Sequence, residues 1–149
     1  MKLRHFAGFT LIELVIVVAI VGIMAAFSWS SYSNSVMKSR RVDAKNALLD
    51  LAAREEKYYS TNNAYVGTAQ ALGYGNSSAQ GSIPVYSGAG SYYSLSISVG
   101  KNPDSFTLQA VPTNGQTSDA CYTYVLDNLG TQSNVDASNT PITNQPNCW

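Results

Sequence analysis

The stretch that decides the fold of this chain is Gly8-Phe9-Thr10-Leu11-Ile12-Glu13, which opens an apolar run over residues 14–27. The run contains only Leu, Val, Ile, Ala, Met, Phe and one Gly, with no charged residue and no Pro. Together with its flanks it gives roughly twenty mostly apolar positions, about the length that a helix needs to cross a bilayer core. Glu13 lies near the start of this span, where burying a carboxylate costs about 2.5–3.5 kcal/mol on insertion scales. A plain membrane anchor gains nothing from such a group, so Glu13 indicates a further role and requires a partner.

A secretory signal peptide is the alternative interpretation of this N-terminus. Lys2 and Arg4 precede the apolar run, as in such peptides. Their apolar region, however, normally spans about 7–15 residues and ends at a small-x-small cleavage site. The run here is longer, and residues 25–28, Ala-Ala-Phe-Ser, are the nearest candidate for such a site. We expect cleavage between Gly8 and Phe9 instead, which leaves the apolar helix in the mature protein.

The basic leader that ends in Gly8, the aromatic Phe9 and the acid at Glu13 resemble the class III leader and cleavage site of type IV prepilins. The resemblance is strong in the first third of the chain and loose after residue 60. It continues through Gly22, Ser31-Tyr32, Arg54-Glu55-Glu56-Lys57-Tyr58-Tyr59 and the paired cysteines Cys121 and Cys148. Many relatives have Pro at the position of Ser30, where it would kink the helix. The ending Cys148-Trp149 and residues 54–59 look most like minor pilins of the type IVa system.

This resemblance implies a structural subunit of a type IV pilus that acts in pilus assembly, twitching motility and adhesion. Prepilin peptidase would cleave the precursor between Gly8 and Phe9 and N-methylate Phe9. In the family, the acid that corresponds to Glu13 pairs with the terminal amine of a neighbouring subunit and sets the axial register of the filament. From the residues alone, the amine of the same chain and the lipid headgroups are alternative partners for Glu13.

The implied partners are other pilin subunits, prepilin peptidase, the inner-membrane assembly machinery and the membrane itself. Before assembly we expect a single-pass inner-membrane protein with a cytoplasmic N-terminus and a periplasmic C-terminal domain, and after assembly an extracellular pilus. Alternative functions are a major pilus subunit, a DNA-uptake receptor pilin and a pseudopilin of type II secretion. A membrane protein with a periplasmic binding domain that never polymerises is a further alternative, and Glu13 argues against it.

The predicted fold class is α+β, with one long helix packed on a small antiparallel sheet, as in the pilin fold. No Pro or Gly interrupts residues 23–63, and Ala44, Leu48 and Leu51 recur at helical spacing, so one helix is expected over about residues 9–60. Strands are expected where apolar and polar residues alternate, at residues 93–99, 106–110 and 121–126. Three parts are expected: a leader (1–8), a transmembrane and filament-core helix (9–30) and a globular headgroup (31–149). The headgroup should contain the second half of the helix, an αβ-loop (61–91), the sheet (92–130) and a C-terminal disulfide region (121–148).

The two cysteines, Cys121 and Cys148, enclose a polar segment with few apolar residues. A disulfide between them closes a loop of roughly 28 residues and contributes about 3–4 kcal/mol on the chain-entropy model. Two free thiols are the alternative. A disulfide requires an oxidising compartment, which places the C-terminal part outside the cytoplasm. In pilins the corresponding disulfide-bounded region faces outward and varies between members.

Composition argues against several other functions. The only histidine, His5, lies in the expected leader, so we expect neither an enzyme nor a metal or cofactor site. Asp127, Asn128 and Asp136 match no calcium-loop spacing. The net charge is +0, and after residue 60 the only basic residue is Lys101. DNA binding relies on phosphate neutralisation by Lys and Arg, so we expect no nucleic-acid partner.

Overall fold

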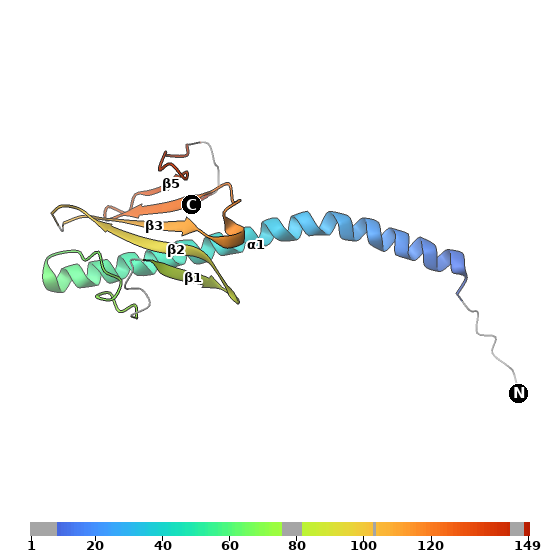
Figure 1. The fold of residues 1–149 in the computed structure, drawn as a ribbon, viewed down its shortest axis with the longest axis horizontal. Helices are drawn as coiled ribbons and strands as arrows, with labels where there is room; N and C mark the ends of the chain where they lie inside the picture. The colour runs from blue at the N-terminus through green and yellow to red at the C-terminus, as the bar shows by residue number, and fades with distance from the viewer. Residues whose placement is uncertain (1–8, 76–81, 103, 144–147) are drawn as a thin grey trace, which may run out of the picture. The chain divides into compact units, whose positions relative to one another are not determined.

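Helix α1 (Leu11–Asn62) is followed by a β-sheet in the computed structural model (Figure 1). The structure describes residues 9–75, 82–102, 104–143 and 148–149, and the side chains of residues 26–31 are not described. The chain divides into two compact units, Met1–Val36 and Met37–Trp149. The elements after α1 are β1 (Ile83–Ser87), β2 (Gly90–Val99), β3 (Phe106–Pro112), the 3-10 turn η2 (Asn114–Gln116), β4 (Thr123–Asp127) and β5 (Gln132–Val135).

Local signals set both ends of α1. The hydroxyl of Thr10 accepts a hydrogen bond from the backbone N–H of Glu13 at 3.4 Å, which satisfies one of the free amides of the first turn. The helix continues without interruption through Gly22 and Ser30. It ends where Asn63 adopts a left-handed conformation (φ 51°), a common way for a helix to stop.

The sheet is a five-stranded antiparallel meander in the order β1-β2-β3-β4-β5. Figure 1 shows that it lies along the second part of α1, within the second unit. Ala44, Leu48 and Leu51 of the helix are fully buried in the core of this unit. The sheet side of the same core consists of Ile83, Val85, Tyr93, Leu95, Phe106, Leu108, Ala110, Tyr124 and Leu126. The expected α+β class, a long helix on an antiparallel sheet, is confirmed.

Two of the five strands, β1 and β5, were not expected from the sequence. β1 lies within the stretch expected to be a loop and contains Pro84, which has no N–H to donate. It is tolerated because β1 is an edge strand, paired only with β2. β5 carries Gln132, Ser133 and Asn134, so it shows no apolar alternation, and its pairing with β4 through the backbone creates the strand.

Candidate functional site

The first part of α1 exposes its apolar side chains. Twelve large apolar residues between Phe9 and Met24 are from 48% to 82% exposed. They are Phe9, Leu11, Ile12, Leu14, Val15, Ile16, Val17, Val18, Ile20, Val21, Ile23 and Met24. In the described part of the chain, no helix combines the length and the apolarity that crossing a membrane requires.

Glu13 lies in the first turn of α1, and its side chain is exposed. The N-terminal end of a helix carries a partial positive charge, which favours an acid at this place. Phe9, the other described residue of the expected processing motif, is also exposed. Gly8, the expected last residue of the leader, lies outside the described residues. The cleavage, the methylation and the pairing of Glu13 therefore stay predictions.

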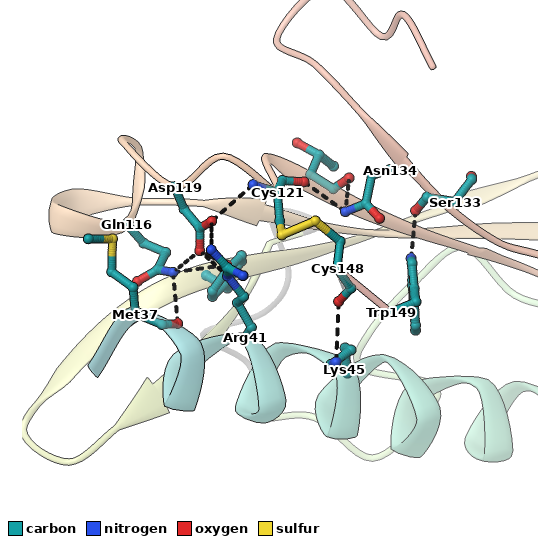
Figure 2. Close-up of a disulfide and its surroundings, with 12 residues drawn as sticks. Met37, Arg41, Lys45, Gln116, Asp119, Cys121, Ser133, Asn134, Cys148 and Trp149 are labelled. Atoms are coloured by element: carbon teal, nitrogen blue, oxygen red, sulfur yellow. Dashed lines mark hydrogen bonds and ion pairs between the residues drawn. A yellow bond between two sulfur atoms is a disulfide. The ribbon is translucent and has the colours of Figure 1, made fainter. Parts of the chain in front are cut away.

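Cys121 and Cys148 are joined by a disulfide with a Cα–Cα distance of 5.5 Å (Figure 2). Both residues are buried. The bond ties the last residues of the chain to the segment before β4, across a separation of 27 residues. The expected intramolecular disulfide is therefore present in the structure, and the alternative of two free thiols is not.

A buried ion pair lies beside the disulfide. Nη2 and Nε of Arg41, on α1, donate to the two carboxylate oxygens of Asp119 at 2.6 Å and 2.8 Å. The Asp119 side chain is 0% exposed, and its Oδ1 also accepts the backbone N–H of Cys121 at 2.9 Å. The hydrogen bond to Asp119 raises the pKa of Arg41 further above its ordinary value. The bidentate geometry gives the pair both strength and a fixed orientation.

Gln116 and Tyr93 complete the surroundings of Asp119. Nε2 of Gln116 donates to Asp119 Oδ2 and, at 3.2 Å, to the backbone carbonyl of Met37 on α1. The hydroxyl of Tyr93 lies 3.5 Å from Asp119 Oδ2, and burial raises the pKa of this phenol. Figure 2 shows Arg41, Gln116 and Asp119 pointing toward one another next to α1, to one side of the disulfide. We call Arg41, Asp119, Gln116 and Tyr93 the Asp119 cluster.

The far side of the disulfide is also attached to the rest of the second unit. Lys45 Nζ on α1 donates to the backbone carbonyl of Cys148 at 3.2 Å. The indole N–H of Trp149 donates to the carbonyl of Ser133 in β5 at 2.9 Å, and its ring packs edge-on against Tyr124. Both ends of the disulfide-bounded segment are thus held to α1, by Arg41 at one end and Lys45 at the other.

Sequence reasoning missed the Asp119 cluster. Arg41 was one of several basic residues on the helix, and Asp119 was one of four acids in a polar stretch. The two residues are separated by 78 positions, so no spacing rule connects them. The one available signal was that Asp119 lies two residues before Cys121, where a disulfide would draw it towards the core.

Glu55, near the end of α1, is fully buried and bonded to the loop that follows the helix. Its Oε2 accepts the backbone N–H of Val66 at 3.1 Å, which fixes the start of the loop after α1. Its Oε1 is buried without a hydrogen-bond partner in the described structure. The pKa of Glu55 is raised overall. Burial is the largest cause and Glu56 adds to it, while the hydrogen bond from Val66 acts in the opposite direction.

Asp127 and Asp136, two of the residues compared above with calcium loops, accept hydrogen bonds from the backbone of the turns that follow them. Oδ1 of Asp127 accepts the N–H groups of Leu129 and Thr131, and Oδ1 of Asp136 accepts those of Ser138 and Thr140. Within the described residues, no group of three His, Cys, Asp or Glu side chains could hold a metal ion.

Comparison with known proteins gives two family matches. Residues 30–125 match the family described as type IV minor pilin ComP, DNA uptake sequence receptor. Residues 3–29 match the prokaryotic N-terminal methylation motif. The second match covers residues 3–8 of the expected leader together with Phe9 and Glu13, which were singled out from the sequence.

Two curated relatives are pilins or fimbrial proteins. The chain is 37% identical over 67 residues to the type IV major pilin protein PilA of Myxococcus xanthus (strain DK1622), covering 45% of this chain and 30% of that protein. It is 38% identical over 66 residues to the fimbrial protein EcpC of Eikenella corrodens, covering 44% and 43% of the two chains. The matches therefore span less than half of either relative.

A solved structure extends the likeness to the fold. A type IV pilin from Shewanella oneidensis aligns with a TM-score of 0.50 and 32% sequence identity, covering 76% of this chain and 97% of that chain. The likeness thus reaches well beyond the N-terminal motif.

Proposed function

Since the chain belongs to the type IV minor pilin family, we propose that it is a structural subunit of a type IV pilus, incorporated as a minor pilin. The observation that carries this proposal is the row of exposed apolar side chains from Phe9 to Met24. Exposed apolar surface on this scale marks an interaction site. Packing of this helix against the same helix of other subunits would remove that surface from water.

We propose that the chain is made as a precursor and is the substrate of an enzyme, not an enzyme itself. Prepilin peptidase cleaves between Gly8 and Phe9 and methylates the new amine of Phe9. The apolar residues after Phe9 hold the subunit in the inner membrane, with the leader in the cytoplasm and the second unit in the periplasm. The assembly machinery then transfers it into a filament that serves adhesion and twitching motility.

Glu13 supplies the charge pairing in this proposal. Among apolar side chains, an unpaired carboxylate is costly, and a nearby amine offsets that cost. Cleavage after Gly8 creates such an amine on Phe9. The side chain of Glu13 is exposed at the helix start and so is available to the Phe9 amine of a neighbouring subunit.

The test is mass spectrometry of sheared surface filaments together with a Glu13→Ala variant. The filaments should contain this chain beginning at N-methylated Phe9, at a small fraction of the main subunit. The Glu13→Ala chain should accumulate in membranes and be at least about tenfold depleted in filaments, because removing one partner of a buried pair costs about 3–5 kcal/mol. Normal incorporation of the variant would reject the pairing role.

A DNA-uptake receptor is the second candidate, favoured by the description of the family matched over residues 30–125. Three basic residues of the helix are already engaged by groups of the same chain, which favours the structural role over phosphate binding. Arg41 pairs with Asp119, Arg40 lies over the ring of Tyr92, and Lys45 bonds to the Cys148 carbonyl.

Fluorescence anisotropy with duplex DNA at low salt separates the two candidates. If the chain is purely structural, we expect the full-length protein in detergent to bind duplex DNA no more tightly than it binds a neutral polymer. Salt-sensitive binding that is lost in Lys101→Ala would establish the receptor role instead, since phosphate contacts weaken steeply with salt.

A further inference from the structure

A groove of about 630 Å³ lies between the last turns of α1 and the loop that follows the helix. One wall is a single face of α1, where lining residues recur at helical spacing; they are Asp50, Ala53, Arg54, Lys57, Tyr58 and Thr61. The other wall is formed by residues 71–73. Its volume lies within the range of small-molecule sites, about 300–1,000 Å³.

Arg54 is held in place at the centre of this groove. Its Nε donates to Asp50 Oδ2 at 2.8 Å, and its Nη1 donates to the backbone carbonyl of Leu72 at 3.1 Å. Its guanidinium also lies over the ring of Tyr74, 4.8 Å from the centroid. Gly73 follows Leu72 in the loop wall with a φ of +86°, a left-handed conformation that glycine adopts readily. Such a pre-ordered group loses little conformational entropy when a ligand binds.

The groove offers both hydrogen-bond donors and an ionised acceptor. Arg54 and Lys57 contribute two positive charges, and Asp50 contributes one negative charge. The hydrogen bond from Arg54 lowers the pKa of Asp50, so this carboxylate is ionised at neutral pH. The Asp50 side chain is 56% exposed, and only its Oδ2 is engaged by Arg54 and Tyr74. Its Oδ1 is therefore left as an acceptor, in a groove that is also lined by the cationic Arg54 and Lys57.

We propose that this groove binds an acidic sugar, the uronate unit of a polysaccharide. A uronate carries a carboxylate that can accept from Arg54 and Lys57, and hydroxyl groups that can donate to Asp50. A phosphodiester chain has no donors on its linkage, and Asp50 would repel it. A neutral sugar would leave the charge of Lys57 without a counterpart. The inference goes beyond the role as a filament subunit, because binding by the isolated chain requires no assembly.

Calorimetric titration of the full-length protein in detergent micelles tests the proposal, with trigalacturonate as the probe. Its neutral counterpart, a galactose trimer, and inorganic tripolyphosphate are the matched comparisons. We expect trigalacturonate alone to bind, with an affinity that falls as salt is added. Lys57→Gln should weaken binding about tenfold, since a hydrogen bond to a charged group contributes on this scale. Lys101→Gln, at an exposed lysine away from the groove, should leave the affinity unchanged.

The Asp50→Asn variant distinguishes uronate recognition from general attraction of anions, because the two predict opposite changes in affinity. Asn keeps an oxygen for Arg54 and Tyr74 but loses the second acceptor, so uronate binding should weaken. If the groove attracts anions in general, the same change removes a repulsive charge and binding should tighten. Absence of trigalacturonate binding, equal binding of tripolyphosphate, or tighter binding by Asp50→Asn would each overturn the proposal. The disulfide and filament incorporation of these variants are separate readouts, so a failure here is distinguishable from a failure of the pilin assignment.

Discussion

The first part of α1 and the segment around the disulfide show opposite relations between polarity and burial. Apolar side chains from Phe9 to Met24 are exposed, whereas the polar Gln116 and Asp119 are fully buried. These buried side chains form hydrogen bonds within the chain. Gln116 donates to the carbonyl of Met37 on α1, and Asp119 accepts the backbone N–H of Cys121. The exposed apolar side chains can be removed from water only by lipid or by other molecules. The segment around the disulfide is thus held by residues of the same chain, whereas the apolar side chains of the first part of the helix have no such cover.

The largest expected effect breaks only the part that needs outside partners. Gly8→Arg should abolish processing, because glycine lets the scissile backbone approach the peptidase closely and a side chain obstructs it. The precursor should remain uncut in membranes and be absent from filaments, as measured by N-terminal sequencing and immunoblotting. The disulfide of the second unit should form as usual. A natural mature chain that begins after Ala26 would contradict this prediction.

The next effect acts on the segment that the chain completes by itself. Changing both Cys121 and Cys148 to Ser should lower the free energy of unfolding by about 3–4 kcal/mol, through the added freedom of the unfolded chain. Urea unfolding of the full-length chain in detergent measures the loss. Limited proteolysis should show faster cleavage after residue 120. Alkylation of both thiols in the natural chain without prior reduction would contradict the premise.

Asp119→Ala should destabilise the second unit by about 3 kcal/mol, the lower end of the cost of breaking a buried ion pair. The lower end applies because the Arg41 side chain is 18% exposed and can reach water. Adding Arg41→Met to Asp119→Ala should recover part of the loss, since no unpaired cation then remains. Urea unfolding of the two single variants and the double variant gives the coupling energy. Strict additivity would mean that the ion pair does not stabilise the unit.

The smallest expected effect concerns the pH dependence from Glu55. Its folded-state pKa is raised above the ordinary value of 4.5, so the folded chain holds the proton more tightly than the unfolded chain. The stability from Glu55 is therefore full below this ordinary value and is lost as pH rises through the folded pKa. Glu55→Gln should flatten that decline, with a smaller change than either preceding variant. Unfolding curves of the natural chain and the Glu55→Gln variant at pH 4 to 8 measure this difference. A parallel loss of stability in both proteins would show that Glu55 is not the group responsible.

Residues close together in the sequence account for what could be predicted from it. The apolar run after Phe9, the acid at Glu13 and the helical spacing of Ala44, Leu48 and Leu51 are all local patterns. The helix and its packing face followed from them, and the alternation of apolar and polar residues predicted three of the five strands, because periodicity depends only on neighbouring positions. The same patterns also led to the pilin family.

Contacts between distant positions decided the rest. The pairing of Arg41 with Asp119, the strand status of polar β5 and the groove between α1 and residues 71–73 have no local signature. The Arg41–Asp119 pair arises because closing the core brings Asp119 to a place without water, where it must find a partner regardless of sequence separation. Strand β5 and the groove depend instead on which distant segments the fold brings side by side. The sequence by itself determined which surfaces are apolar and how they repeat, and the tertiary structure alone decided which polar groups meet.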